Sequence, residues 1–273
     1  MLEHNKLNNA VRLSLLIFSF SILCGCGTLP NGKGWGGDAT YSPGWERVGR
    51  AAYNSLVSPL TWVPVAGAAI VQIDNWDHKI SNWASDKTPI FGSQSNANNW
   101  SYYLMDTSGA LYGATALLTP SGEQTGEWVT DKMKGIIVGG AAFGLSEGVT
   151  GILKLSIDRE RPNDGQHDFP SGHSTAAASF STLAAKNIDT MQLPLTAEIA
   201  SDIGLGLITT GTAWARVEAK KHYPSDVLAG MAIGHFFSAF VNDAFLGLDK
   251  SLGVAPDAEI SKKGFVLSLQ GNF

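Results

Sequence analysis

The chain has 273 residues, of which 44% are hydrophobic, and this is enough for one large domain or two small ones with a sizeable buried core. Its net charge of -5 argues against a nucleic-acid-binding surface, because contact with a phosphate backbone needs clustered Lys and Arg. Its mean hydropathy of +0.03 is low for a protein built mainly of membrane-spanning helices.

Residues 1–25 have the pattern of an export signal, with a positive start and an apolar core at residues 13–23 that is too short to span a bilayer. The end of this stretch resembles a bacterial lipobox, with Cys24 where that pattern usually has Ala, Ser, Thr or Val. The resemblance implies that Cys26 is lipidated and anchors a periplasm-facing protein to the cell envelope. Gly27 after it favours the outer membrane over the inner one. The alternative is an ordinary cleaved signal peptide.

Residues 26–44 are rich in Gly, Pro and Asn, which is typical of a flexible tether. A helical domain is expected over residues 45–250, because apolar stretches there alternate with polar connectors and have the lengths of helices. These stretches are residues 51–73, 102–118, 135–153, 174–186, 197–215 and 227–246. Residues 251–273 form a C-terminal tail, in which alternating apolar and polar residues after Lys263 predict one short strand.

Two of the apolar stretches have about the length of a bilayer core, roughly 20 residues. Polar side chains interrupt both of them. Glu147 lies in the stretch 135–153, and His235, Asn242 and Asp243 lie in the stretch 227–246. We therefore expect these helices to be buried in a soluble bundle rather than to cross a membrane.

The first cluster with chemical potential runs from Lys154 to Pro162. Lys154 and Arg161 are seven positions apart, which places them on one face of a helix, whereas Arg159 lies off that face. Their charges suit a tetrahedral phosphate dianion. Pro162 ends the helix and fixes the direction of Arg161. Taken alone, such a cluster is most often a solvated helix end, because the negative pole of a helix attracts cations.

The second cluster is Pro170-Ser171-Gly172-His173, followed by residues that form helices well. Ser171 and Gly172 are therefore expected at a helix start, where backbone N–H groups create an anion site. His173 at the same edge can exchange a proton near neutral pH. The plainer interpretation is a Ser N-cap beside a surface His.

The third cluster contains Arg216, His222, Pro224 and Asp226. Pro224 suits the first turn of a helix, so that His222 lies just before the helix and Asp226 within its first turn. A carboxylate in this position can bind one imidazole nitrogen and leave the other as a nucleophile. Alternatively, Asp226 only stabilises the helix start and His222 is structural.

In order and spacing, the three clusters resemble the signature of the type 2 phosphatidic acid phosphatase superfamily, which includes bacterial acid phosphatases, lipid phosphatases and vanadium-dependent haloperoxidases. The match covers residues 154–226, with Ala215 where the family usually has Ser or Gly. The resemblance implies an all-α helical bundle of this kind, with the short C-terminal strand as an addition. It also implies a phosphatase that hydrolyses phosphomonoesters or lipid phosphates.

The resemblance assigns roles to the residues of the clusters. His222 attacks phosphorus and becomes phosphohistidine, Asp226 holds its tautomer, and His173 protonates the leaving group and then activates water. The phosphate is bound by Lys154, Arg161, Ser171, Gly172 and Arg216. No metal cofactor is expected, because three cations can stabilise the transferred group, and phosphate or vanadate would occupy the same site. The expected partners are a phosphorylated lipid or small phosphomonoester, and the membrane through Cys26.

Two other functions stay open. In a vanadium-dependent haloperoxidase, vanadate would occupy the anion site with His222 as its ligand. In a non-catalytic structural lipoprotein, the fold would persist without turnover, although the intact His173, His222 and Asp226 count against it.

Overall fold

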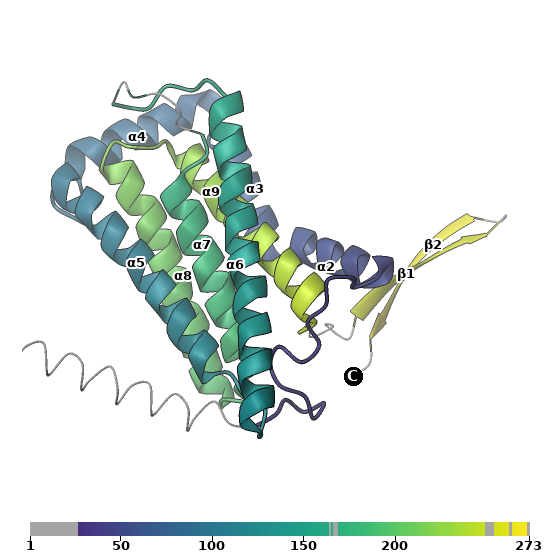
Figure 1. The fold of residues 1–273 in the computed structure, drawn as a ribbon. Helices are drawn as coiled ribbons and strands as arrows, with labels where there is room; N and C mark the ends of the chain where they lie inside the picture. Colours follow the sequence, from purple (N-terminus) through teal and green to yellow (C-terminus); the bar gives the residue numbers. More distant parts are fainter. Residues whose placement is uncertain (1–26, 164, 166–168, 249–253, 262–263, 272–273) are drawn as a thin grey trace, which may run out of the picture.

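The computed structural model describes residues 27–163, 165, 169–248, 254–261 and 264–271. Its fold is all-α, as the sequence predicts, with a small hairpin after the helices (Figure 1). The elements are α2 (Trp45–Val57), α3 (Pro59–Ile70), η1 (Ile73–Asn75), α4 (Trp76–Lys87), α5 (Gln94–Leu118), α6 (Thr125–Ser156), α7 (Gly172–Ile188), α8 (Leu195–Glu218), α9 (Pro224–Val241), η2 (Asn242–Leu246), β1 (Val254–Ser261) and β2 (Gly264–Gly271).

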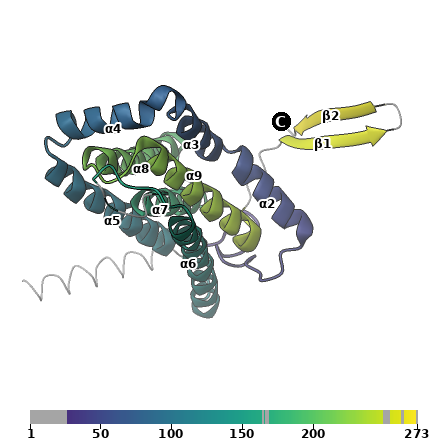
Figure 2. The same cartoon turned by 90° about the horizontal axis from the view of Figure 1, so that it is seen from above.

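Helix α7 is the central helix of the bundle and packs against α5, α6, α8 and α9, which surround it in Figure 2. Small side chains allow this close packing. A Cβ on Gly234 of α9 would lie only 2.3 Å from the carbonyl oxygen of Thr175 in α7, so only Gly fits at that crossing. The central position of α7 matters for function, because its first residues are those of the second cluster.

Two features of the helical pattern differ from the prediction. The apolar stretch 51–73 is divided, because α2 ends at Val57 and Pro59, which lacks a backbone N–H, begins α3. Helix α4 was not predicted, because it buries Asp77 and Ser81 and exposes about half of Trp83. A helix that buries polar groups carries no apolar stripe to recognise.

The segment expected to be a flexible tether is instead packed against the bundle. Trp35 is 1% exposed, contacts Ala116 and Leu246, and donates its backbone N–H to the carbonyl of Pro120 at 2.8 Å. A Cβ on Gly135 of α6 would lie 2.0 Å from the Trp35 ring. Glycine therefore serves close approach in this region, whereas the sequence interpretation took the glycines of the tether as a sign of flexibility.

The two ends of the chain were predicted to form a signal peptide and a short strand. The strand expected after Lys263 corresponds to β2, which pairs in antiparallel register with β1, a strand that was not predicted. The expected signal peptide, residues 1–25, and the expected lipidation site, Cys26, lie outside the described residues.

Candidate active site

The three sequence clusters meet at one end of the bundle, where α6 ends, α7 and α9 begin, and α4 lies across the helix ends (Figure 1). The backbone N–H of Ser171 donates to the carbonyl of Asp226 at 3.0 Å, which joins the second cluster to the third. This bond corrects one expectation, since the Ser171 N–H does not face a phosphate. The N–H groups of Gly172 and His173 are the first two of α7 and have no acceptor within the helix.

The cations of the first and third clusters surround both histidines. Lys154, Arg161 and Arg216 lie close enough to His173 and to His222 for their charges to act on each ring. His222 also lies close enough to His173 for its charge to act on the His173 ring. The Cε atom of Lys154 lies 3.9 Å from the Cβ position of Gly172, so the lysine reaches the start of α7. Three positive charges and a helix start thus converge, which is the composition of a phosphate site.

His222 lies in the short connection between α8 and α9 and is 2% exposed. Burial holds the pKa of its imidazole well below the usual 6.5, and the nearby charges of Arg216 and Lys154 lower it further, while Asp226 acts in the opposite direction. The ring is therefore neutral at physiological pH. A neutral imidazole keeps the lone pair that a nucleophile needs.

Two buried nitrogen atoms in the site have no hydrogen-bond partner among the described residues. They are Nε of Arg161 and Nε2 of His173. The His173 ring is held edge-on against Tyr102 of α5, with 4.4 Å between the ring centroids. Buried polar atoms are nearly always paired, so these two nitrogens indicate a place for an anionic ligand.

Arg216 is positioned by two residues that sequence reasoning missed. Its Nη1 donates to Asn98 Oδ1 at 3.0 Å and to Ser101 Oγ at 3.2 Å, and both acceptors are on α5. Arg216 as a whole is 5% exposed. No local signal in the sequence connects residues more than a hundred positions apart, so this support could only be found in the structure.

A second missed group surrounds Asp226. Its carboxylate accepts hydrogen bonds from the backbone N–H of Tyr223 at 2.7 Å and from Arg159, and its charge acts on His222. Arg159 also donates to Asp77 of α4 at 2.6 Å, and Asp77 accepts from the backbone N–H of Ser225 at 2.8 Å. The prediction that Lys154 to Arg161 form one helix ended by Pro162 was wrong, because α6 ends at Ser156 and Arg159 and Arg161 lie in the loop that follows. Arg159 nevertheless serves a different partner from the phosphate, as predicted from its position. Asp77 carries no recognisable sequence signal.

Comparison with known proteins agrees with the fold and the clusters. Residues 135–247 match the model of the PAP2 superfamily. The match begins within α6 and ends after η2, and it contains all eight residues proposed for catalysis and phosphate binding.

Two curated relatives and one solved structure are similar. Lipid A 1-phosphatases of Rhizobium johnstonii and Rhizobium etli are 34% and 33% identical, over 39% of this chain. The aligned region is 46% and 48% of their own lengths, so the chain spans about half of each relative. The first transmembrane PAP2 type phosphatidylglycerolphosphate phosphatase from Bacillus subtilis has the same fold, with a TM-score of 0.51, 20% identity and coverage of 70% of this chain and 94% of that one.

These likenesses contradict the expected localisation as a lipid-anchored protein of the outer membrane. The similar solved structure is of a transmembrane enzyme, and by length and composition α6 and the segment of α9 with η2 could each cross a membrane. The polar residues that led us to expect a soluble bundle face inward, so they do not argue against helices that cross a membrane. His235, Asn242 and Asp243 are buried, whereas Ile137 and Ile152 are exposed.

Proposed function

We propose that this chain is a phosphatase that hydrolyses a lipid phosphate through a phosphohistidine at His222, without a metal ion. The main support for the proposal is that the charges of Lys154, Arg161 and Arg216 act on both His222 and His173. His173 lies at the start of α7. Such a site binds a phosphate and places a nucleophile and an acid beside it. The similarity to lipid phosphatases supports the same reaction class.

In the first step, a ring nitrogen of His222 attacks phosphorus and forms a P–N bond while the P–O bond to the leaving group breaks. The leaving oxygen takes a proton from His173. The three cations stabilise the charge on the remaining phosphate oxygens, which is the main requirement of phosphoryl transfer. Asp226 balances the positive charge that develops on His222, as its electrostatic influence on that ring suggests.

In the second step, water attacks phosphorus and the P–N bond breaks. His173 now accepts a proton from the water, and the products are inorganic phosphate and neutral His222. The same side chain therefore acts first as an acid and then as a base, as microscopic reversibility requires. This cycle uses only side chains of the chain itself and water.

The surroundings of the site favour a lipid substrate over a small soluble ester. Helices α4 and α5, next to the site, expose large aromatic side chains, namely Trp76, Trp83, Trp100, Tyr102 and Tyr103. Trp and Tyr are typical of the boundary between lipid and water. The named activities of the relatives concern lipid A and phosphatidylglycerolphosphate, so we propose a membrane lipid that carries a terminal phosphate.

The test is hydrolysis of an aryl phosphate and of a panel of lipid phosphates in the presence of a chelator, with native protein and His222→Ala. We expect release of phosphate by the native protein in chelator, a preference for lipid phosphates, and loss of activity in the variant. Full activity in His222→Ala, or activity restored only by a divalent metal, would overturn the proposal. Halide oxidation dependent on added vanadate would instead indicate a haloperoxidase.

A further inference from the structure

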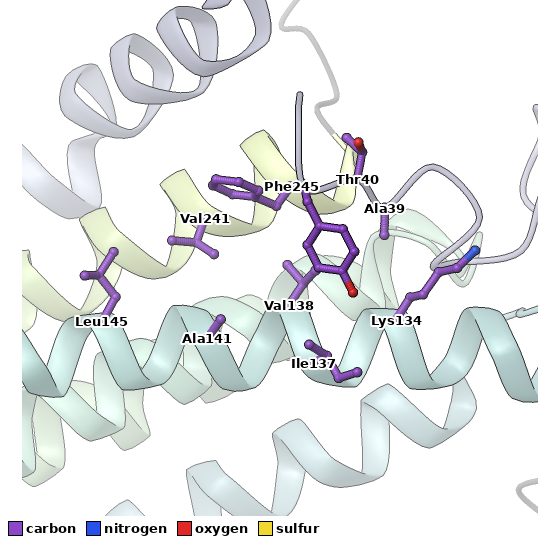
Figure 3. Close-up of a pocket in the computed structure, with 10 residues that line it drawn as sticks. Ala39, Thr40, Lys134, Ile137, Val138, Ala141, Leu145, Val241 and Phe245 are labelled. Atoms are coloured by element: carbon purple, nitrogen blue, oxygen red, sulfur yellow. The ribbon is translucent and has the colours of Figure 1, made fainter. Parts of the chain in front are cut away.

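An apolar groove lies on α6, away from the phosphate site. It has a cavity volume of about 380 Å³ and is bounded by α6, by α9 with η2, and by residues 39–41 (Figure 3). Most of its lining is aliphatic or aromatic, with Ala39, Ile137, Val138, Ala141, Leu145, Val241 and Phe245. Lys134 stands at the end of the row of α6 residues, as Figure 3 shows.

A polar pocket adjoins this groove and shares Lys134 with it. The pocket has a volume of about 530 Å³, and its other charged lining residues are Lys33, Glu127 and Asp131. The ammonium of Lys134 lies 3.1 Å from the Asp131 carboxylate, and its side chain is 41% exposed. The two hollows therefore form one amphipathic site, apolar on one side of Lys134 and polar on the other.

The length of the groove corresponds to one leaflet of a bilayer. Lys134 and Leu145 are eleven positions apart, which is about 16 Å along a helix, or about half of a hydrocarbon core of roughly 30 Å. Lys134 and Lys154 are twenty positions apart, which is about 30 Å, the whole core. A membrane-spanning α6 thus places Lys134 at the headgroup level opposite the phosphate site.

We propose that this site binds one membrane phospholipid, with an acyl chain in the groove and its phosphodiester beside Lys134 in the polar pocket. The ligand is distinct from the substrate, because the phosphate site at Lys154 is a membrane thickness away. The proposal rests on α6 crossing the membrane and not on the phosphatase activity. The bound lipid would fasten residues 39–41 to α6 and α9, and so stabilise the folded chain.

The experiment measures the thermal unfolding midpoint of the full chain in detergent during titration with phosphatidylglycerol, phosphatidylethanolamine or diacylglycerol. Ligands that bind only the folded state raise this midpoint. We expect both phospholipids to raise it and diacylglycerol, which lacks the phosphate, to have at least a tenfold weaker effect. The stronger phospholipid identifies the headgroup, anionic or zwitterionic, that the pocket accepts.

Two variants and one control separate this site from general lipid contact. Ala141→Phe fills the groove and Lys134→Gln removes the cation, and each is expected to require at least tenfold more phospholipid for the same rise. Gly140→Phe is the control, because open space surrounds its Cβ position and it does not line the groove. An equal response of all variants, an equal effect of diacylglycerol, or a change of oligomeric state in Ala141→Phe with unaltered lipid response would overturn the proposal.

Discussion

Arg159 donates a hydrogen bond to the carboxylate of Asp226, and this bond connects the loop of the first cluster to the helix that follows His222. The same guanidinium binds Asp77, so one cation is shared by two carboxylates that are 0% and 1% exposed. Two buried carboxylates in close proximity are strongly unfavourable without such a partner. Arg159 is therefore a positioning residue for Asp226.

Arg159→Gln is expected to destabilise the chain by about 3–5 kcal/mol, because two buried carboxylates lose the cation that they share. It should also lower kcat more than it raises KM, because Asp226 acts on the nucleophile. Unfolding in detergent and steady-state kinetics measure the two effects. Lys79→Gln is the control, since it breaks an exposed ion pair with Asp74 at 2.8 Å and should cost about 0–1 kcal/mol. Equal stability of both variants would contradict this role.

The activity of the native protein should persist in mildly acidic solution. Since the pKa of His222 is lowered, its imidazole stays neutral at pH values below the usual 6.5. The fall of log kcat/KM that protonation of His222 causes is therefore expected below pH 6.5. Lys154→Gln removes one of the charges that lower this pKa, so in the variant this fall should move to higher pH. The pH profiles of native protein and variant, compared with the same substrate, measure the shift. A fall at an unchanged pH would show that Lys154 does not act on His222.

His173→Ala should separate the two chemical steps. With an aryl phosphate, whose leaving group needs little protonation, the first step should remain fast. The second step should slow by about 10²–10⁴-fold, because no base activates the water. A burst of one equivalent of phenol followed by a slow phase is therefore expected in stopped-flow absorbance. Slow release without a burst would place the main role of His173 in the first step.

The packing of Trp35 against α6 gives a test of the N-terminal segment. Gly135→Ala should destabilise the fold by about 1–3 kcal/mol, since the new methyl group overlaps the Trp35 ring. Gly140→Ala on the same helix meets nothing within 4 Å and should be neutral or stabilising by up to about 1 kcal/mol. Unfolding midpoints of the two variants provide the comparison. If both behaved alike, residues 27–43 would not be packed in solution.

The sequence could predict the parts of the site that depend on local geometry. The helix starts at Gly172 and Pro224 follow from the properties of Ser, Gly and Pro. The shared helix face of Lys154 and Arg161 was predicted wrongly, because α6 ends at Ser156 and Arg161 lies in the loop after it. The all-α fold followed from the family resemblance, and the lengths of the apolar stretches agreed with it.

Long-range contacts could not be predicted in this way. Asn98 binds Arg216 from α5, and Asp77 binds Arg159 from α4, and neither residue has a local pattern that marks it. The sequence also did not reveal whether a polar side chain in a helix faces the inside or the outside of the bundle. His235 and Asp243 seemed to argue against a membrane helix, but they face the bundle, where His235 binds Thr182 and Asp243 accepts a hydrogen bond from Lys186. The glycines around Trp35 were misinterpreted because Gly allows close packing as readily as it allows flexibility.

The most direct test of the central claim is to identify the phosphorylated residue. An aryl phosphate labelled in its phosphate group is mixed with His173→Ala, the reaction is quenched in base, where a phosphoramidate survives, and the peptides are mapped by mass spectrometry. The proposed mechanism predicts label on His222 and none in the double variant with His222→Ala. Label on another residue, or turnover without a labelled protein, would contradict it.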